Sequence, residues 1–139
     1  MDDEAEIRAL IGAHFEALGW SEGGTPDWRR FRADFLLDAR LFPAARPVES
    51  KTLDDFAARM ERVAREVLTT FEEHTRGMEV RVFGNIAVVL AASEMIENGQ
   101  DINRDVSDYL VVKSGGQWRI AAQAWDRETP ERPVPPDLL

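Results

Sequence analysis

Apolar and polar residues alternate along four consecutive runs between Met78 and Asp126, a spacing that is typical of β-strands. Short breaks at residues 84–85, 98–99 and 114–116 separate the runs, and each break contains glycine next to asparagine or serine. These residues suit the tight turns of hairpins, where positive φ angles are common. The pattern therefore predicts a four-stranded antiparallel meander.

The lengths of these breaks predict which residues of neighbouring strands face each other, because loop length fixes the register of a hairpin. Loops of two, two and three residues place three largely apolar rows on one face, which is predicted to be buried. These rows are Val82, Ala87, Leu110 and Ile120; Val80, Val89, Asp108 and Ala122; and Met78, Ala91, Val106 and Ala124. Toward one end the same face is predicted to become polar. The rows there are Arg76, Ser93, Arg104 and Asp126; and His74, Met95 and Ile102.

Two helices are predicted at the start of the chain. Apolar residues recur at helical spacing over residues 7–18, and Asp3 with Glu6 resembles a capping box in front of them. Thr25-Pro26 is predicted to begin a short second helix, because proline suits the first helical position.

A short strand and a third helix are predicted to follow. Residues 39–42 alternate weakly and predict a strand at the edge of the meander. Residues 53–68 carry the clearest helical stripe, opened by an approximate capping box of Thr52 and Asp55. The change from this helix to the first long strand is predicted near Thr70.

Length, charge and composition exclude several classes of function. A chain of 139 residues can form one domain with a substantial core. Its net charge of −9 argues against binding to nucleic acid. It contains no cysteine, which excludes disulfides and thiolate chemistry. The acidic N-terminus and the absence of a long apolar run predict a soluble cytoplasmic protein that binds no membrane.

Particular strings within this α+β pattern resemble a known group of proteins. The strings are ADFLLDARLFP, VRVFGNIAVVL and SDYLVVKSGGQWRIAAQAWD. They are similar to the nuclear transport factor 2-like superfamily, also called ketosteroid-isomerase-like or polyketide-cyclase-like, and especially to its small bacterial members of unassigned function.

This resemblance covers nearly the whole chain and implies one domain over residues 1–139, in which residues 129–139 form an extended proline-rich tail. The implied fold is cystatin-like: a cone-shaped half-barrel with three N-terminal helices packed in a curved antiparallel meander of four to five strands. Such proteins frequently dimerise through the outer face of the sheet. The fold does not imply one activity, because isomerases, dehydratases, cyclases and non-catalytic binders share it.

The chain departs from the isomerase members of the group at two places. Those proteins carry a catalytic carboxylate just after the first strand and a tyrosine in the first helix. Here Leu41, Phe42 and Pro43 supply no acid, and the first predicted helix contains His14 but no tyrosine. The isomerases also use an aspartic acid on a meander strand, and Asp108 is similar in kind.

Asp108 and His14 are the candidate catalytic residues. Asp108 is predicted to lie among apolar side chains, where burial would raise its pKa and suit it to acid–base chemistry. Alternatively, His14 or a backbone group forms a hydrogen bond with the Asp108 carboxyl group, or a bulge turns this side chain outward. His14 lies on an apolar helical stripe, so it is either a core histidine or the acid–base partner of Asp108.

Further residues are candidates for substrate binding. Arg76, Ser93, Arg104 and Asp126 form the polar row; there the arginines could hold an anion, or Arg104 and Asp126 form a salt bridge. His74 is predicted to face the same interior. The aromatic residues Trp28, Phe31 and Phe35 line either the core or an apolar pocket. No spaced ligand motif predicts a metal or another cofactor.

Two functions remain open from the sequence. The first is a pocket protein for small apolar or aromatic carbonyl compounds, oriented by Asp108 and His14, with a cofactor-independent isomerase, dehydratase or cyclase as one version. The second is a non-catalytic module with a filled pocket that forms a homodimer or binds a partner through the outer sheet. Apolar residues predicted on that outer face favour the homodimer. They are Val88, Leu90, Tyr109, Val111 and Trp125.

Overall fold

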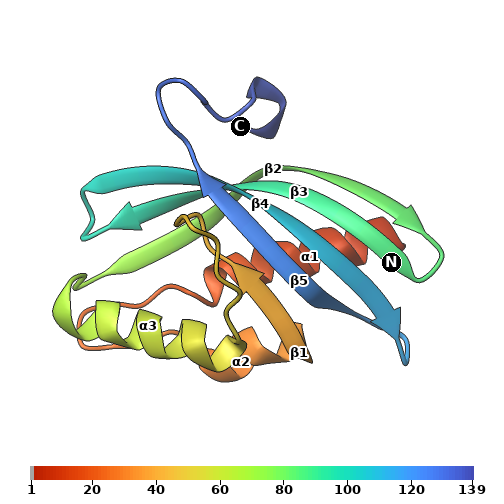
Figure 1. Cartoon of the computed structure of the whole chain (residues 1–139), viewed down its shortest axis with the longest axis horizontal. Helices are drawn as coiled ribbons and strands as arrows, with labels where there is room; N and C mark the ends of the chain where they lie inside the picture. The colour runs from red at the N-terminus through yellow and green to blue at the C-terminus, as the bar shows by residue number, and fades with distance from the viewer. Residues whose placement is uncertain (1) are drawn as a thin grey trace.

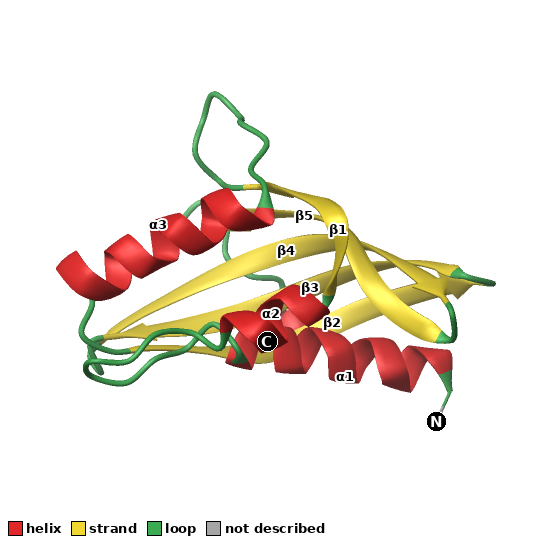
Figure 2. Ribbon diagram, turned by 90° about the horizontal axis from the view of Figure 1, so that it is seen from below, coloured by secondary structure: helices red, strands yellow, loops and turns green. Residues whose placement is uncertain are grey.

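The computed structural model describes residues 2–139, which form three α-helices, one five-stranded sheet and a short C-terminal 3-10 helix (Figure 1). The elements are α1 (Asp3–Glu16), α2 (Trp28–Ala33), β1 (Phe35–Phe42), α3 (Leu53–Glu66), β2 (Phe71–Phe83), β3 (Ile86–Glu97), β4 (Asp101–Ser114), β5 (Gln117–Arg127) and η1 (Pro136–Leu138). Figure 2 shows one curved sheet with the helices beside it, the α+β half-barrel expected from the sequence. No helix formed by these residues is both long enough and apolar enough to cross a membrane.

The strands lie in the order β1-β5-β4-β3-β2, and the last four form the predicted antiparallel meander. The strand expected at the edge is also present, but it begins at Phe35 rather than Ala39 and pairs with β5 in parallel. The sheet is therefore mixed rather than wholly antiparallel. The long connection through α3 carries the chain from this edge strand to the opposite edge of the sheet.

Local capping interactions define where each helix begins. The capping box of Thr52 and Asp55 at α3 is confirmed, with both hydrogen bonds at 3.0 Å. The other two predicted caps are wrong by one or two residues. Asp2 caps α1 by accepting from the backbone N–H of Ala5, and Asp27 caps α2. Each aspartate reaches the N–H three residues ahead, so the helix starts directly after it.

The hairpin between β3 and β4 decides which side chains of β4 face the core. Glu97 pairs with Asp101, so the loop contains three residues instead of the predicted two. Asn98 and Gly99 accommodate this turn with φ angles of 53° and 69°. The extra residue shifts β4 by one position relative to β3 and turns its side chains to the opposite face. The predicted register is therefore wrong from this hairpin onward.

This shift reverses the placement of the leading candidate residue. Asp108, predicted to be buried, is exposed on the outer face, whereas its neighbours Ser107 and Tyr109 are buried on the inner face. The pairing of β5 with β4 also departs from the prediction, because the turn before β5 is shorter and a register shift follows. As a result, Gln123 is buried on the inner face.

A β-bulge at residues 76–77 reverses the alternation within β2. Between the bulge and the following turn, the pairs with β3 are those predicted from the sequence. Before the bulge, each β2 side chain points to the face opposite to the predicted one. His74 and Arg76, predicted to face inward, are therefore exposed, and Glu73 is buried instead.

The C-terminal tail packs across the outer face of the sheet. Val134 and Leu138 form a small buried cluster with Ala92 of β3. Figure 1 shows this segment on the side of the sheet away from α2 and α3. The tail covers only part of the outer face, where Val88 and Leu110 remain exposed. Tyr109 and Val111, expected on that face, lie inside because of the shifted register.

The close approach of the C-terminal tail explains why residue 77 is glycine. A Cβ atom at this position would lie 2.6 Å from the Cα of Leu138, far inside van der Waals contact. The absent side chain therefore allows the tail to approach the sheet.

We expect Gly77→Ala to lower the free energy of unfolding by about 1–3 kcal/mol, because the added methyl group must displace the backbone of the tail. Gly12→Ala is the matched control, since a Cβ there meets only the Thr75 side chain at 3.7 Å within a helix that favours alanine. Chemical denaturation measures both variants. Equal stabilities for the two would contradict the close approach of the tail.

Candidate functional site

The inner face of the sheet holds a group of buried polar residues beneath α1. His14 of α1 faces Tyr109 of β4, with ring centroids 5.6 Å apart and ring planes at 87°. The rings of Phe31 and Phe35 also surround the imidazole, at centroid distances of 5.4 and 5.3 Å. Aromatic side chains thus enclose His14 on several sides, and its side chain is completely buried.

Burial makes His14 neutral. Desolvation lowers the pKa of His14 to about 3, because an imidazolium ion would lose its hydration in this apolar surrounding. The amide of Gln123 lies near the ring and opposes part of this decrease in pKa. The two side chains do not, however, meet the geometry of a hydrogen bond. Among residues 2–139, neither ring nitrogen has a hydrogen-bond partner. A neutral imidazole in this state can accept one proton or hydrogen bond and donate another.

Asp34 lies between α2 and β1, next to the start of β5. Its backbone carbonyl accepts a hydrogen bond from the N–H of Ile120 at 2.8 Å, which holds the residue against β5. Its carboxylate oxygen Oδ1 lies 3.3 Å from the guanidinium group of Arg30, while Oδ2 is buried without a partner among the described residues. Burial raises the pKa of Asp34 to about 6, although Arg30 opposes the shift.

Among the described residues, Tyr109 is the third side chain with a buried polar atom that has no hydrogen-bond partner. Its hydroxyl group has no partner within residues 2–139. Burial raises the pKa of Tyr109 well above its usual value, and the nearby carboxyl groups of Glu73 and Asp34 act in the same direction. The hydroxyl therefore remains protonated and can donate a hydrogen bond to an oxygen atom of a ligand.

Glu73 is a second buried carboxyl group on the inner face. It accepts a hydrogen bond from the hydroxyl of Ser93 at 2.8 Å. Burial raises the pKa of Glu73 to about 8, and the neighbouring carboxyl group of Asp105 adds to the shift. Glu73 is therefore mostly protonated at neutral pH. The register predicted from the sequence does not place Glu73 inside, although a glycine within a strand, here Gly77, is a known signal of a bulge.

Two surface clefts lead toward these carboxyl groups. The first cleft, of about 410 Å³, lies between α1, α2 and the start of β5 and includes Glu6, Arg30, Asp34, Trp118 and Arg119 in its wall. The second cleft, of about 330 Å³, lies near the C-terminal end of α1 and reaches Glu73. Each buried acid is thus approached from a different end of α1.

The structure separates most of the predicted site residues. His14 and Asp108 lie on opposite sides of the sheet, so they cannot form the expected dyad. The side chain of His74 is 48% exposed, and Arg76 points to solvent as well. Of the predicted polar row, only Ser93 is buried on the inner face.

The predicted salt bridge between Arg104 and Asp126 is absent from the described part of the chain. Arg104 instead contacts Glu94 at 3.0 Å and Glu128 at 3.6 Å, while Asp126 lies 3.3 Å from Arg132. The register of β3 and β4 pairs Arg104 with Glu94, whereas Glu128 and Arg132 lie beyond the end of β5.

The predicted aromatic residues belong to the core. Phe31 and Phe35 are buried, and Trp28 packs beside them while its indole N–H donates to the carboxylate of Glu61. Phe31 and Phe35 also contact His14, so they form part of the wall around the buried polar group. They close the space in which the sequence had suggested a pocket.

Comparison with known proteins identifies the fold. A protein of unknown function from Pseudomonas putida KT2440, described as NTF2-like, superposes with a TM-score of 0.71 over 100% of this chain and 99% of its own, at 19% identity. The chain has the nuclear transport factor 2-like fold. No family model and no curated protein sequence matches it.

Two further structures with the nuclear transport factor 2-like fold carry names that suggest an activity. One is named "Putative Scytalone Dehydratase", from Novosphingobium aromaticivorans, with a TM-score of 0.69, 14% identity and coverage of 91% of this chain and 85% of its own. The other is a "putative dehydratase" from Streptomyces avermitilis, with a TM-score of 0.71, 14% identity and coverage of 91% and 96%. At such identities the likeness establishes the fold alone.

The buried acid predicts a pH dependence of stability. The folded protein holds the proton of Glu73 up to a pH of about 8, whereas the unfolded chain releases it near 4.5. Ionisation therefore favours the unfolded state, and the stability contributed by protonated Glu73 is lost as the pH rises from about 4.5 to about 8.

We expect Glu73→Gln to remove this loss, so that the variant gains about 1 kcal/mol or more over the natural protein between pH 5 and pH 8. The amide can still accept the hydrogen bond from Ser93. Glu72→Gln, an exposed neighbour on the same strand, is the control. Denaturation at both pH values provides the measurement, and an identical pH response of the two variants would refute the raised pKa of Glu73.

Proposed function

We propose that this protein binds a small carbonyl compound and carries out acid–base chemistry on it without a cofactor, with Asp34, His14 and Tyr109 as the reacting and binding groups. The observation that supports the proposal is the presence of buried polar atoms without partners on all three side chains. Each unpaired group costs about 1–3 kcal/mol, against a typical total stability of about 5–15 kcal/mol. A ligand that formed these hydrogen bonds would recover that energy.

Each of the three residues suits a distinct role. Asp34, with a pKa of about 6, is ionised at neutral pH yet retains affinity for a proton, as a general base requires. The hydroxyl group of Tyr109 can donate a hydrogen bond to the carbonyl oxygen as negative charge develops there. Neutral His14 can accept from, or donate to, a second polar group of the ligand.

The corresponding reaction is the removal of a proton from the carbon next to the carbonyl group. The Asp34 carboxylate takes this proton, and the electron pair of the broken C–H bond moves onto the carbonyl oxygen. Returning the proton to another carbon completes an isomerisation. In a dehydration, the electron pair returns from the oxygen and re-forms the carbonyl group, a C=C bond forms to the next carbon, and the C–O bond of a hydroxyl group on that carbon breaks. Asp34 gives its proton to this hydroxyl group, which leaves as water. The dehydratase names of two proteins with the same fold favour the second outcome.

Access to the reacting groups depends on the first cleft. Asp34 forms part of its wall, whereas His14 and Tyr109 do not, so a ligand entering by this cleft reaches Asp34 before the other two residues. Phe31 and Phe35 pack against His14, and their rings must move before a ligand can contact the imidazole. Ligand binding is therefore coupled to a local rearrangement between α2 and the sheet.

A second candidate function is a non-catalytic module that dimerises through the outer sheet. Two observations favour it. Aromatic rings fill the space around His14. On the outer face, an apolar pair is exposed, formed by Val88 and by Leu110 opposite it on β4. In this alternative, no compound would be bound beside Asp34 and the inner polar groups would have only a structural role.

Proton exchange tests the role of Asp34. 2-Tetralone, an aromatic ketone with acidic C–H bonds, is incubated with the protein in D2O, and deuterium incorporation is followed by NMR. We expect catalysed exchange to increase as the pH rises through about 6, because the base must be ionised. Asp34→Asn should lower the rate of catalysed exchange by at least about a hundredfold.

Asp38→Asn is the matched control for this experiment, because Asp38 is exposed on β1 four residues beyond Asp34. Its exchange rate should equal that of the natural protein. Equal rates for Asp34→Asn and the natural protein would reject the proposed chemistry and leave the non-catalytic alternative.

Replacing His14 separates a functional role from a structural one. His14→Leu should raise the free energy of unfolding by about 1–2 kcal/mol, since it removes an unpaired buried polar group at similar volume. The same variant should weaken binding of 2-tetralone, measured by NMR titration. His74→Leu, at an exposed position, should leave binding unchanged. Raised stability with unaltered binding would show that His14 has no part in ligand recognition.

A further inference from the structure

Two arginines belong to the wall of the first cleft, which also includes Asp34. Arg30 comes from α2, and Arg119 comes from the first residues of β5, before β1 begins to pair with that strand. The remaining wall includes the apolar side chains of Leu10 and Trp118. The wall of the cleft therefore combines apolar residues with two arginines.

Arg119 is a cation without an acidic partner within the described chain. No carboxylate of residues 2–139 lies within 4.0 Å of it, and its guanidinium group donates to the neutral amide oxygen of Gln117. Several other arginines of the described chain also lack an acidic partner, but of all these only Arg119 belongs to the wall of the first cleft. Such an arginine retains donors for an incoming oxyanion.

Arg30 has an acidic partner, Asp34, but this contact leaves part of its guanidinium group available. Its guanidinium group lies 3.3 Å from Oδ1 of Asp34, and 47% of its side chain is exposed. Since a guanidinium group has five N–H donors in a planar fork, Arg30 can contact Asp34 and a second oxyanion together.

We propose that the first cleft binds a carboxylate-bearing ligand, with Arg119 and Arg30 holding the carboxylate beside Asp34. The inference rests on the proposed function and makes it more specific: the compound on which Asp34 acts is a carboxylic acid that also carries the reacting carbonyl group. The two arginines bind one end of this molecule, and the apolar wall of Leu10 and Trp118 contacts its carbon skeleton.

Binding of an anion at this place affects the proton affinity of Asp34. The charged groups around the carboxylate are Arg30 of α2 and, across the first cleft, Glu6 of α1 and Arg119 of β5; Tyr109 of β4 lies behind it. Arg30 is the group that opposes the raised pKa of Asp34. A ligand carboxylate that engages Arg30 weakens this opposition and adds a negative charge nearby, so the pKa of Asp34 rises further. Ligand affinity should then increase as the pH falls from 8 toward 6.

Benzoate and benzamide form a matched pair of probes, since they share size and shape and differ in charge. NMR titration of the full chain at pH 6.5 and low salt should give a Kd for benzoate about tenfold or more below that for benzamide. The preference should decline as salt is added, because both the arginines and the ligand are partly exposed to solvent.

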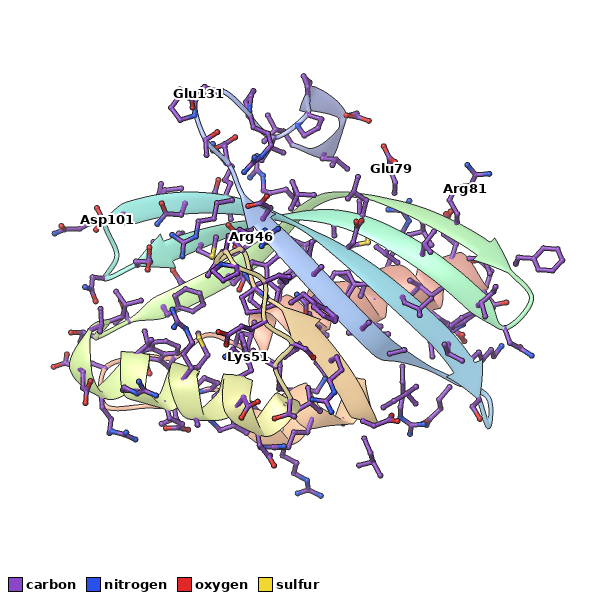
Figure 3. The ribbon with its side chains drawn as sticks, viewed as in Figure 1. Arg46, Lys51, Glu79, Arg81, Asp101 and Glu131 are labelled. Carbon is purple, nitrogen blue, oxygen red and sulfur yellow. The ribbon has the colours of Figure 1, made fainter. Side chains whose placement is uncertain are left out.

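Arg119→Gln should weaken benzoate binding by about tenfold while leaving benzamide binding unchanged. Arg81→Gln is the control, because Arg81 is exposed on β2 and points away from the body of the molecule (Figure 3). Equal affinity for the two probes, or equal effects of Arg119→Gln and Arg81→Gln, would overturn the carboxylate site.

The tests of the carboxylate site and of the acid–base chemistry can fail separately. Exchange of 2-tetralone that depends on Asp34, together with no preference for benzoate, would reject only the carboxylate site. A benzoate site that depends on Arg119, together with no exchange dependent on Asp34, would support anion binding and reject the proposed chemistry.

Discussion

Burial of one face of α1 against the inner side of the sheet is the interaction on which the rest of this structure depends. Ile7, Ile11 and Phe15 lie on this face and are almost completely shielded from solvent. His14 shares the same face at helical spacing, so the helix cannot bury its apolar stripe without also burying the imidazole. Formation of the core thus places a polar ring among aromatic side chains, including that of Tyr109.

Burial then determines the electrostatics of the inner face. His14, Asp34, Glu73 and Tyr109 are all shifted toward their neutral forms, but to different degrees. Two carboxyl groups near one face consequently differ in proton affinity, with pKa values of about 6 and about 8. Acid–base sites commonly exploit such a difference. The nuclear transport factor 2-like fold supports many activities, so the chemistry has to be argued from these side chains rather than from the fold.

Local signals in the sequence were sufficient for most of the fold. Turn residues, two-residue alternation and helical spacing predicted the meander, the three helices, the edge strand and the change from helix to strand near Thr70. They also placed His14 on the apolar stripe of the first helix and Ser93 on the inner face of the sheet, where both are buried. These features depend on neighbours close in the chain, which a sequence displays directly. The resemblance to the nuclear transport factor 2-like group supplied the half-barrel arrangement.

Only the tertiary structure decided which side chains form the candidate site. One additional residue in the turn after β3 turned Asp108 outward and Tyr109 inward. A bulge in β2 turned Glu73 inward in place of His74. The length of this turn and the position of the bulge are set by the pairing between whole strands, which local propensity does not determine. Because strand side chains alternate with a period of two, a one-residue change that barely alters the fold reverses the chemistry of each face.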